Sequence, residues 1–254
     1  MSESIHRSSS GVAALSTPLL EVSGLQAGYG DVQVLWDASL RVEAGSIACL
    51  VGSNGAGKTT LMRTLSGLVR ARAGSVRFNG QDLTGAAPDT VLSAGIAHVP
   101  EGRRLFSAMS VRDNLLMGAY LRRDGEAAIR RDLDRMYSLF PILQSRSAQN
   151  AGTLSGGEQQ MCAIARGLMG LPKLLLIDEL SLGLAPAVVE SLCEALRQLN
   201  AQGLTLLVVE QDVATALELA RHAFIMDTGR ITRSGSSADL RDDPAIREAY
   251  LGVV

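Results

Sequence analysis

Lysine is almost absent from this chain of 254 residues, whose 24 basic residues comprise two lysines, Lys58 and Lys173, and 22 arginines. Aromatic residues make up only 4% of the chain. The formal net charge is −2, so no overall positive field favours nucleic acid as a partner. Because this chain uses arginine at nearly every basic position, each lysine marks a position where a compact ammonium stands in place of a broad planar guanidinium.

Cysteine and histidine are also scarce, and the chain has three of each: Cys49, Cys162, Cys193, His6, His98 and His222. The cysteines form no C-x-x-C pair and have no zinc-ligand spacing to a histidine, which argues against a zinc site and a disulfide framework. No apolar run approaches the roughly 20 residues that a membrane-spanning helix needs. The sequence therefore predicts no structural metal, no disulfide and no membrane span.

Hydrophobic residues make up 46% of the chain, which is ample for a core. The length suits one large α/β domain, or one domain with a modest insertion. The first residues are rich in serine and lack hydrophobic periodicity, so we expect a disordered extension over residues 1–19. The folded domain is expected over residues 20–254.

One glycine-rich stretch organises the chain. Its residues are Gly52, Ser53, Asn54, Gly55, Ala56, Gly57, Lys58, Thr59 and Thr60. They match G-x-x-x-x-G-K-[ST], the phosphate-binding loop of nucleotide hydrolases, between an apolar strand over residues 47–51 and a helix. Lys58 is expected to reach the terminal phosphates, and Thr59 to offer its hydroxyl to Mg²⁺. A flexible glycine loop with a chance lysine is the weaker interpretation, because strand and helix flank the motif correctly.

Apolar strands and helices alternate over most of the remaining chain. Strands are expected at residues 96–99, 173–178, 205–209 and 223–226, with helices between them, which predicts a parallel sheet covered on both faces. Strands over residues 20–27, 33–42 and 76–78 predict a flanking antiparallel β subdomain. Residues 102–152 have helical patterns and predict an inserted α-helical subdomain. Its arginines, among them Arg130, Arg131 and Arg135, are most simply a solvated face, with a docking surface as the alternative.

Two carboxylates end the apolar strand over residues 174–178. In a parallel sheet the carboxyl ends of the strands face the ligand crevice. Asp178 is therefore placed to hold Mg²⁺ opposite Thr59, and Glu179 to polarise a water molecule that attacks the γ-phosphate.

A second glycine-rich helix start comprises Ser155, Gly156, Gly157 and Glu158. Ser155 can cap the helix, and the glycines leave N–H groups open to an anion. Because the chain then holds two phosphate-binding helix starts, the second one plausibly faces the nucleotide of another subunit.

Together these three motifs resemble the Walker A, signature and Walker B elements of ATP-binding cassette (ABC) ATPases, over residues 20–254. Residues 99–106, 114–120 and 181–186 resemble one subgroup, the second ATP-binding subunit of high-affinity branched-chain amino acid importers. The resemblance implies ATP and Mg²⁺ as cofactors. It also implies a location on the cytoplasmic side of the cell membrane, peripherally attached.

Several single residues take their expected roles from this resemblance. Tyr29 corresponds to the aromatic residue that stacks on adenine. Glu101 stands where most cassettes have a glutamine that senses the metal and the attacking water. Gln211 stands where most have a histidine that contacts the γ-phosphate, and with Lys58 and Glu179 it completes the expected catalytic set. Leu180 replaces a proline, which is expected to loosen the turn that holds Glu179.

The resemblance further implies an ATP sandwich with a second cassette subunit, as a homodimer or a heterodimer. Membrane permease subunits and a separate solute-binding protein complete the expected assembly, and no nucleic acid is expected. Related importers of urea or short amides remain open. So do a non-transport cassette ATPase of DNA repair or translation, and a non-hydrolytic regulator. The short helical insertion speaks against coiled-coil repair arms, and the single cassette without a basic extension speaks against a translation factor.

Overall fold

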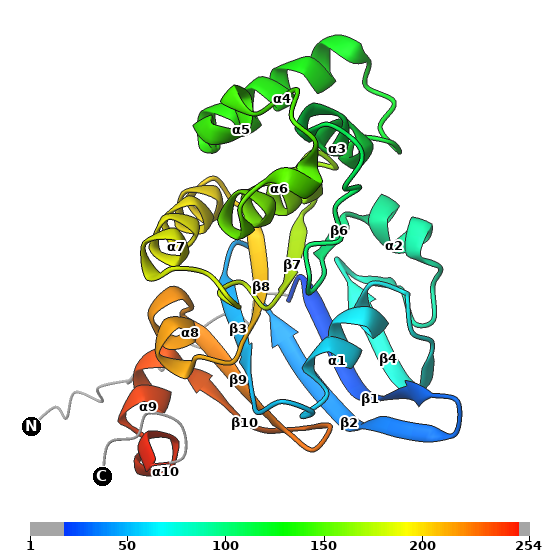
Figure 1. The fold of residues 1–254 in the computed structure, drawn as a ribbon. Coiled ribbons are helices and arrows are strands. Elements are labelled where there is room, and N and C mark those ends of the chain that lie inside the picture. Colours follow the sequence, from blue (N-terminus) through cyan, green and yellow to red (C-terminus); the bar gives the residue numbers. More distant parts are fainter. Residues whose placement is uncertain (1–17, 249–254) are drawn as a thin grey trace, which may run out of the picture.

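The structure is a computed structural model, and it describes residues 18–248. Two β-sheets form the lower part of the molecule as drawn, and a group of helices lies above them (Figure 1). The expected extension over residues 1–19 falls almost entirely outside the described residues. Leu19, however, is buried and pairs through its backbone with Val42 and Asn79, so the folded domain includes it.

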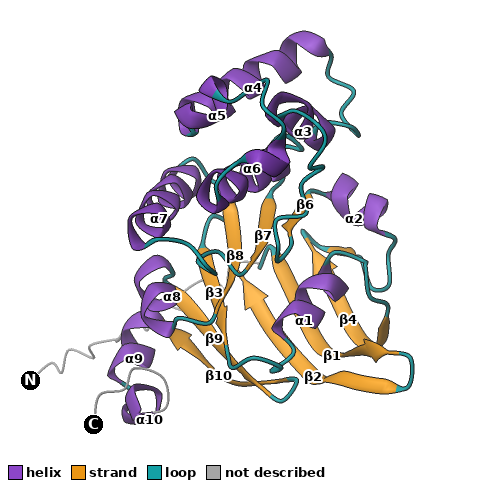
Figure 2. Ribbon diagram, viewed as in Figure 1, coloured by secondary structure: helices purple, strands orange, loops and turns teal. Residues whose placement is uncertain are grey.

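The larger sheet has six strands in the order β10-β9-β3-β8-β7-β6 (Figure 2). These strands are β3 (Ile47–Val51), β6 (Ile96–Val99), β7 (Leu174–Asp178), β8 (Thr205–Glu210), β9 (His222–Asp227) and β10 (Arg230–Ser236). All neighbouring pairs are parallel except β10 with β9. The strand that leads into the phosphate loop, β3, therefore lies centrally between β8 and β9.

The parallel strands of this sheet are buried on both faces, which explains why their sequences are nearly unbroken apolar runs. Along β3, Cys49 and Val51 join a core shared with α6 (Gly156–Leu168), α7 (Pro186–Ala201) and α8 (Val213–Leu219). Ala48 and Leu50 point to the opposite face, into a core shared with α1 (Lys58–Leu65) and the second sheet. The alternation of side chains along the strand thus ties the two cores together.

The second sheet is antiparallel, with strand order β2-β1-β4-β5. Its strands are β1 (Leu20–Tyr29), β2 (Val32–Val42), β4 (Ala71–Phe78) and β5 (Gln81–Asp82). The predicted strand over residues 76–78 is the end of β4, whose first half the sequence analysis missed because its exposed Arg72 and Gly74 break the apolar pattern. The flanking antiparallel subdomain is otherwise as expected.

The helical region contains α3 (Val111–Gly118), α4 (Glu126–Leu139), α5 (Pro141–Ser145) and the short 3₁₀ turn η1 (Ala151–Thr153). Ser110 caps α3 by accepting a hydrogen bond from the Asp113 N–H. The helix ends at Gly118. A Cβ on Gly118 would lie 1.9 Å from the Arg166 carbonyl oxygen, so α3 and α6 approach each other backbone to backbone.

Three further short helices complete the described chain, α2 (Pro88–Ala94), α9 (Ser237–Asp242) and α10 (Pro244–Ile246). The predicted fold class is confirmed: an α/β phosphate-loop core, a flanking antiparallel β subdomain and an inserted helical subdomain. Between residues 18 and 248, no helix is both long enough and apolar enough to cross a membrane.

Candidate functional site

The phosphate loop joins β3 to α1, and its lysine is held inside it. Lys58 is only 5% exposed, and its Nζ donates hydrogen bonds to the carbonyl oxygens of Gly52 (2.7 Å) and Ser53 (3.0 Å). Burial lowers the pKa of Lys58, while the surrounding carboxylates, Glu179 first among them, oppose that shift. The ammonium is thus prearranged at the centre of the loop, with anionic groups around it.

The hairpin between β9 and β10 supports this loop from outside. The N–H of Gly229 donates to the carbonyl oxygen of Ala56 across 2.8 Å. A Cβ on Gly52 would lie 2.3 Å from the Met226 carbonyl oxygen, and one on Gly229 would lie 1.9 Å from that of Val34. Only glycine permits these approaches, so the loop conformation depends on contacts far away in the sequence.

Asp178 and Thr59 meet across the site, as the sequence predicts. The Thr59 hydroxyl donates to Oδ1 of Asp178 at 3.3 Å, while Oδ2 of Asp178 is buried without a partner. Burial raises the pKa of the Asp178 carboxyl to about 6. Within the described residues no three His, Cys, Asp or Glu side chains gather as a metal site. Mg²⁺ is usually held by one or two carboxylates together with substrate phosphates, so this hydroxyl and this orphaned carboxylate oxygen fit it.

Glu179 is held by Gln211. The Gln211 Nε2 donates to Oε1 of Glu179 across 2.6 Å, and Oε2 of Glu179 is buried without a partner. The backbone of Glu179 has φ 57°, in the left-handed region that non-glycine residues rarely adopt. One carboxylate oxygen is therefore fixed, and the other is available to a ligand or water.

The turn after Glu179 is tightly held, so the loosening expected from Leu180 does not occur. Leu180 is fully buried in the core. The next residue, Ser181, donates from its N–H and its hydroxyl to the two carboxylate oxygens of Glu210, at 2.9 and 2.8 Å. Hydrophobic burial and this bidentate contact thus replace the rigidity that a proline would supply.

Glu210 is a functional residue that the sequence analysis missed. It is 1% exposed, and burial raises the pKa of its carboxyl. It also accepts a hydrogen bond from the N–H of Gln211 at 3.3 Å, so it positions both Ser181 and the residue that holds Glu179. The available signal was its place at the end of an apolar strand, the same signal that identified Asp178.

A hollow of about 590 Å³ brings the expected catalytic residues together. Its lining consists of Val34, Asn54, Gly55, Gly57, Lys58, Thr59, Thr60, Glu101, Glu179, Leu182 and Gln211. Tyr29 is not part of this lining. It is 43% exposed at the end of β1, and its hydroxyl accepts a hydrogen bond from Arg63 at 3.3 Å. Its expected place beside adenine remains a prediction.

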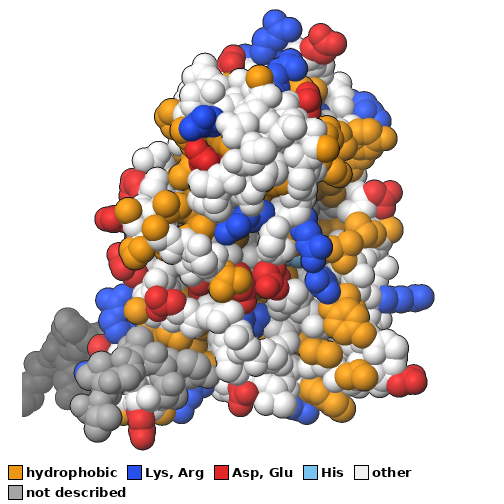
Figure 3. All heavy atoms as spheres, viewed as in Figure 1, with side chains coloured by type: hydrophobic (Ala, Val, Ile, Leu, Met, Phe, Trp, Pro, Cys, Tyr) orange, Lys and Arg blue, Asp and Glu red, His pale blue; other side chains and the backbone are white. Residues whose placement is uncertain are grey.

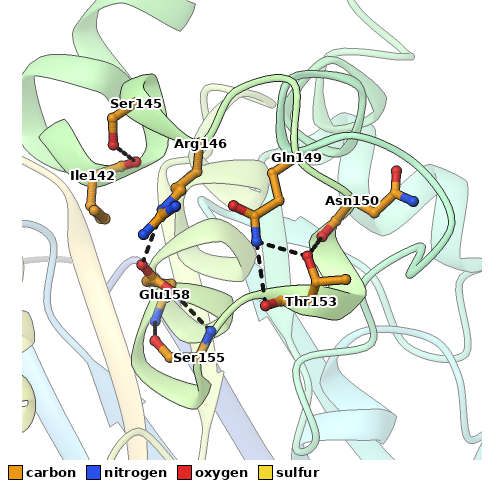
Figure 4. Close-up of polar contacts among 8 residues, drawn as sticks. All are labelled: Ile142, Ser145, Arg146, Gln149, Asn150, Thr153, Ser155 and Glu158. Atoms are coloured by element: carbon orange, nitrogen blue, oxygen red, sulfur yellow. Dashed lines mark hydrogen bonds and ion pairs between the residues drawn. The ribbon is translucent and has the colours of Figure 1, made fainter.

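The second glycine-rich helix start, residues 155–158, does not line this hollow. Ser155 and Glu158 form a capping box at the start of α6, and Arg146 pairs with Glu158 at 3.8 Å (Figure 4). The hydrogen bond from the Ser155 N–H lowers the pKa of the Glu158 carboxyl. Gly156 and Gly157 thus open a firmly anchored helix that contributes no residue of its first turn to the hollow around the chain's own phosphate loop.

An apolar groove of about 470 Å³ lies between α2, α3 and α6. Several large hydrophobic side chains on its walls are exposed, namely Leu68, Leu92, Phe106, Met117 and Tyr120. Hydrophobic side chains gather along this side of the molecule in Figure 3. His98 lies in the lining, and its Nε2 is buried without a partner. Arg130 and Arg131 lie exposed elsewhere, on α4.

Comparison with known proteins places these features in a family. Residues 35–181 match the model of the family described as ABC transporter. A crystal structure of an ATP-binding cassette of an ABC transporter in its ADP conformation superposes with a TM-score of 0.82. It is 26% identical in sequence, and the alignment covers 93% of this chain and all of that one.

Three curated relatives cover two kinds of transport, amino acid import and lipopolysaccharide export. The high-affinity branched-chain amino acid transport ATP-binding protein BraG of Pseudomonas aeruginosa is 46% identical, over 88% of this chain and 95% of BraG. BraF, another high-affinity branched-chain amino acid transport ATP-binding protein of the same organism, is 28% identical over 94% of this chain and 99% of BraF. The lipopolysaccharide export protein LptB of Haemophilus influenzae is 31% identical over 92% of this chain and 97% of LptB.

Proposed function

The chain belongs to the ABC transporter family of ATP hydrolases, and from that premise we propose that it energises an importer of branched-chain amino acids. The observation that carries the proposal is the 46% identity with BraG over nearly the whole of both chains. The export protein LptB is 31% identical to this chain and BraF is 28% identical, so identities near 30% do not separate the transported substrates. Only the 46% identity with BraG bears on the substrate. Urea or short-amide import is the alternative.

We assign roles to the residues that line the hollow, and to Asp178 and Tyr29, which lie outside its lining, as follows. Lys58 binds the terminal phosphates, and the loop N–H groups at the start of α1 bind the remaining phosphate oxygens. Thr59 and Asp178 hold Mg²⁺, which neutralises phosphate charge when it is bound, and Glu101 lies beside them. Glu179 accepts a proton from the attacking water through its free Oε2. Tyr29 packs against the adenine.

The residues that open α6 serve a second cassette. Ser155, Gly156, Gly157 and Glu158 do not line the hollow of their own chain, which supports their use at the ATP of a partner. The partner we favour is a related cassette and not a second copy. BraG and BraF are two different ATP-binding proteins for the same transport in one organism, which supports such a pair.

The permease binds the apolar groove between α2, α3 and α6. Hydrophobic side chains such as Phe106 (47% exposed) and Tyr120 (73% exposed) are unfavourably exposed to water, and an apolar segment of a partner would bury them. With the permease bound there, the chain would lie against the cytoplasmic face of the membrane. None of the residues assigned above binds an amino acid. We therefore assign the selection of the solute to the permease and a separate binding protein.

Transport in proteoliposomes tests the proposal. The chain is reconstituted with its permease, its partner cassette and the binding protein, with ATP inside the vesicles. We expect ATP-dependent uptake of leucine, isoleucine and valine that unlabelled valine inhibits and urea does not. Uptake of urea or a short amide in place of leucine would assign the alternative substrate. Lys58→Ala is the control that should abolish uptake of any solute.

A further inference from the structure

The loop that follows Glu101 has an unusual backbone that α6 holds in place. Three successive residues have left-handed φ values: Gly102 (71°), Arg103 (63°) and Arg104 (46°). Arg166 of α6 donates hydrogen bonds to the carbonyl oxygens of Arg103 (3.0 Å) and Arg104 (2.9 Å). The loop is thus fastened to the helix that begins with the second glycine-rich motif.

The side chain of Arg103 also contacts α6. Its Nε donates to Oε1 of the buried Gln160 at 3.3 Å, and its Nη2 donates to the Leu182 carbonyl oxygen at 3.4 Å. Its Nη2 and Nη1 lie 3.4 and 3.5 Å from where a Cβ on Gly156 would stand. A guanidinium has five N–H groups, so these two contacts leave three for another acceptor.

This placement is electrostatically unfavourable without an anion. A helix N-terminus carries about half a positive charge, so a second cation beside it is repelled. Glu158, the acidic residue in the first turn of α6, is already engaged by the Ser155 N–H and by Arg146. A positively charged side chain that is nevertheless fixed here by two hydrogen bonds is arranged for a negatively charged ligand.

Arg103 does not line the hollow around its own phosphate loop, although Glu101 does. We propose that Arg103 is an ATP-binding residue that acts between subunits, donating hydrogen bonds to the terminal phosphates of the nucleotide held by the partner cassette. The inference rests on the proposed pairing of two cassettes. One short loop then serves both sites, its own through Glu101 and the partner's through Arg103.

The test uses the complex of this chain with its partner cassette and permease, in two backgrounds. In the first, Lys58→Ala silences this chain's own site, so that hydrolysis reports the nucleotide of the partner. In the second, the equivalent lysine of the partner is replaced by alanine, so that hydrolysis reports this chain's own nucleotide. Arg103→Ala and Arg103→Lys are then introduced into this chain in each background.

We expect Arg103→Ala to raise the KM for ATP about 10- to 100-fold in the first background, the size of one charge-assisted hydrogen bond. Arg103→Lys keeps the charge and should fall between alanine and arginine. In the second background both variants should leave KM unchanged. An equal effect in both backgrounds, or none in the first, overturns the inference and leaves the proposed function intact. Absence of hydrolysis by the unmodified complex overturns both.

Discussion

Gln211 and Glu179 form a direct side-chain pair: the amide nitrogen of one donates to a carboxylate oxygen of the other across 2.6 Å. The pair joins the ends of β8 and β7, two neighbouring parallel strands. A neutral amide fixes the carboxylate in place without neutralising its charge. The expected base is therefore oriented before any nucleotide binds, and its second oxygen stays free.

Replacing the base separates binding from hydrolysis. Glu179→Gln keeps the shape and loses the proton acceptor, so we expect ATP to bind normally and turnover to fall about 10²- to 10⁴-fold. Gln211→Ala should lower turnover less, because the carboxylate survives without its positioning partner. ATP affinity and single-turnover rates at this chain's own site measure both effects, in an assembled complex whose partner cassette carries alanine in place of its phosphate-loop lysine. Near-normal turnover of Glu179→Gln would assign the base role to another group.

Lysine specificity in the phosphate loop can be tested with an internal control. Lys58 is buried against two carbonyl oxygens, so both Lys58→Ala and Lys58→Arg should lose ATP binding, the latter because a guanidinium does not fit the closed loop. Lys173, the other lysine of the chain, is exposed, and Lys173→Arg should bind ATP normally. Binding of a fluorescent ATP analogue reports all three variants. Full affinity in Lys58→Arg would contradict the argument from size.

Residues whose role follows from local pattern were predictable, and residues that act through distant contacts were not. The phosphate loop and the strand that ends at Asp178 each carry their signal within a few positions of the sequence. The support of Ser181 by Glu210 joins residues 29 positions apart, and the contact between Arg103 and Gln160 joins residues 57 apart. Single-sequence periodicity contains no information on such pairs, so the tight turn around Leu180 could not be foreseen.

The lowered pKa of His98 makes the free energy of unfolding depend on pH. Burial, and to a smaller extent the positive charge of Arg63, lower the pKa of its imidazole from 6.5 to about 4. Between these values the unfolded chain takes up a proton that the folded chain does not, so stability falls as the pH falls. The loss between pH 7 and pH 5 should be about 2 kcal/mol. Denaturant unfolding at both pH values should show a smaller loss in His98→Gln, and an equal loss would contradict the assignment.

The apolar groove and the arginines of α4 offer a direct comparison of docking surfaces. Tyr120→Asp places a charge among exposed hydrophobic side chains, so we expect the chain to lose most of its association with the permease while it still binds ATP. Arg130→Glu combined with Arg131→Glu changes a solvated surface and should leave association intact. Co-purification with detergent-solubilised permease measures both. The opposite pattern would move the docking surface to α4.

The pair of cassettes should be asymmetric, with the weaker hydrolytic site on this chain. Gln211 supplies only a neutral dipole near the γ-phosphate, where a histidine could carry charge. Glu101 adds a negative charge to a hollow that must accept phosphate oxygens. The start of α6 has no such defect, and by our proposal it serves the ATP of the partner.

Damage to the start of α6 should therefore harm hydrolysis at least as much as damage to Glu179. Gly156→Asp is the suitable change, because a Cβ there lies 3.4 Å from the Arg103 guanidinium, and by our proposal its carboxylate would compete with the partner's phosphate for that cation. Gly157→Asp is less clean, since its Cβ would lie 2.7 Å from Val188 and disturb packing as well. ATP turnover of the reconstituted complex is measured with Gly156→Asp or Glu179→Gln in this chain alone. If Glu179→Gln abolishes turnover while Gly156→Asp is harmless, the stronger site belongs to this chain.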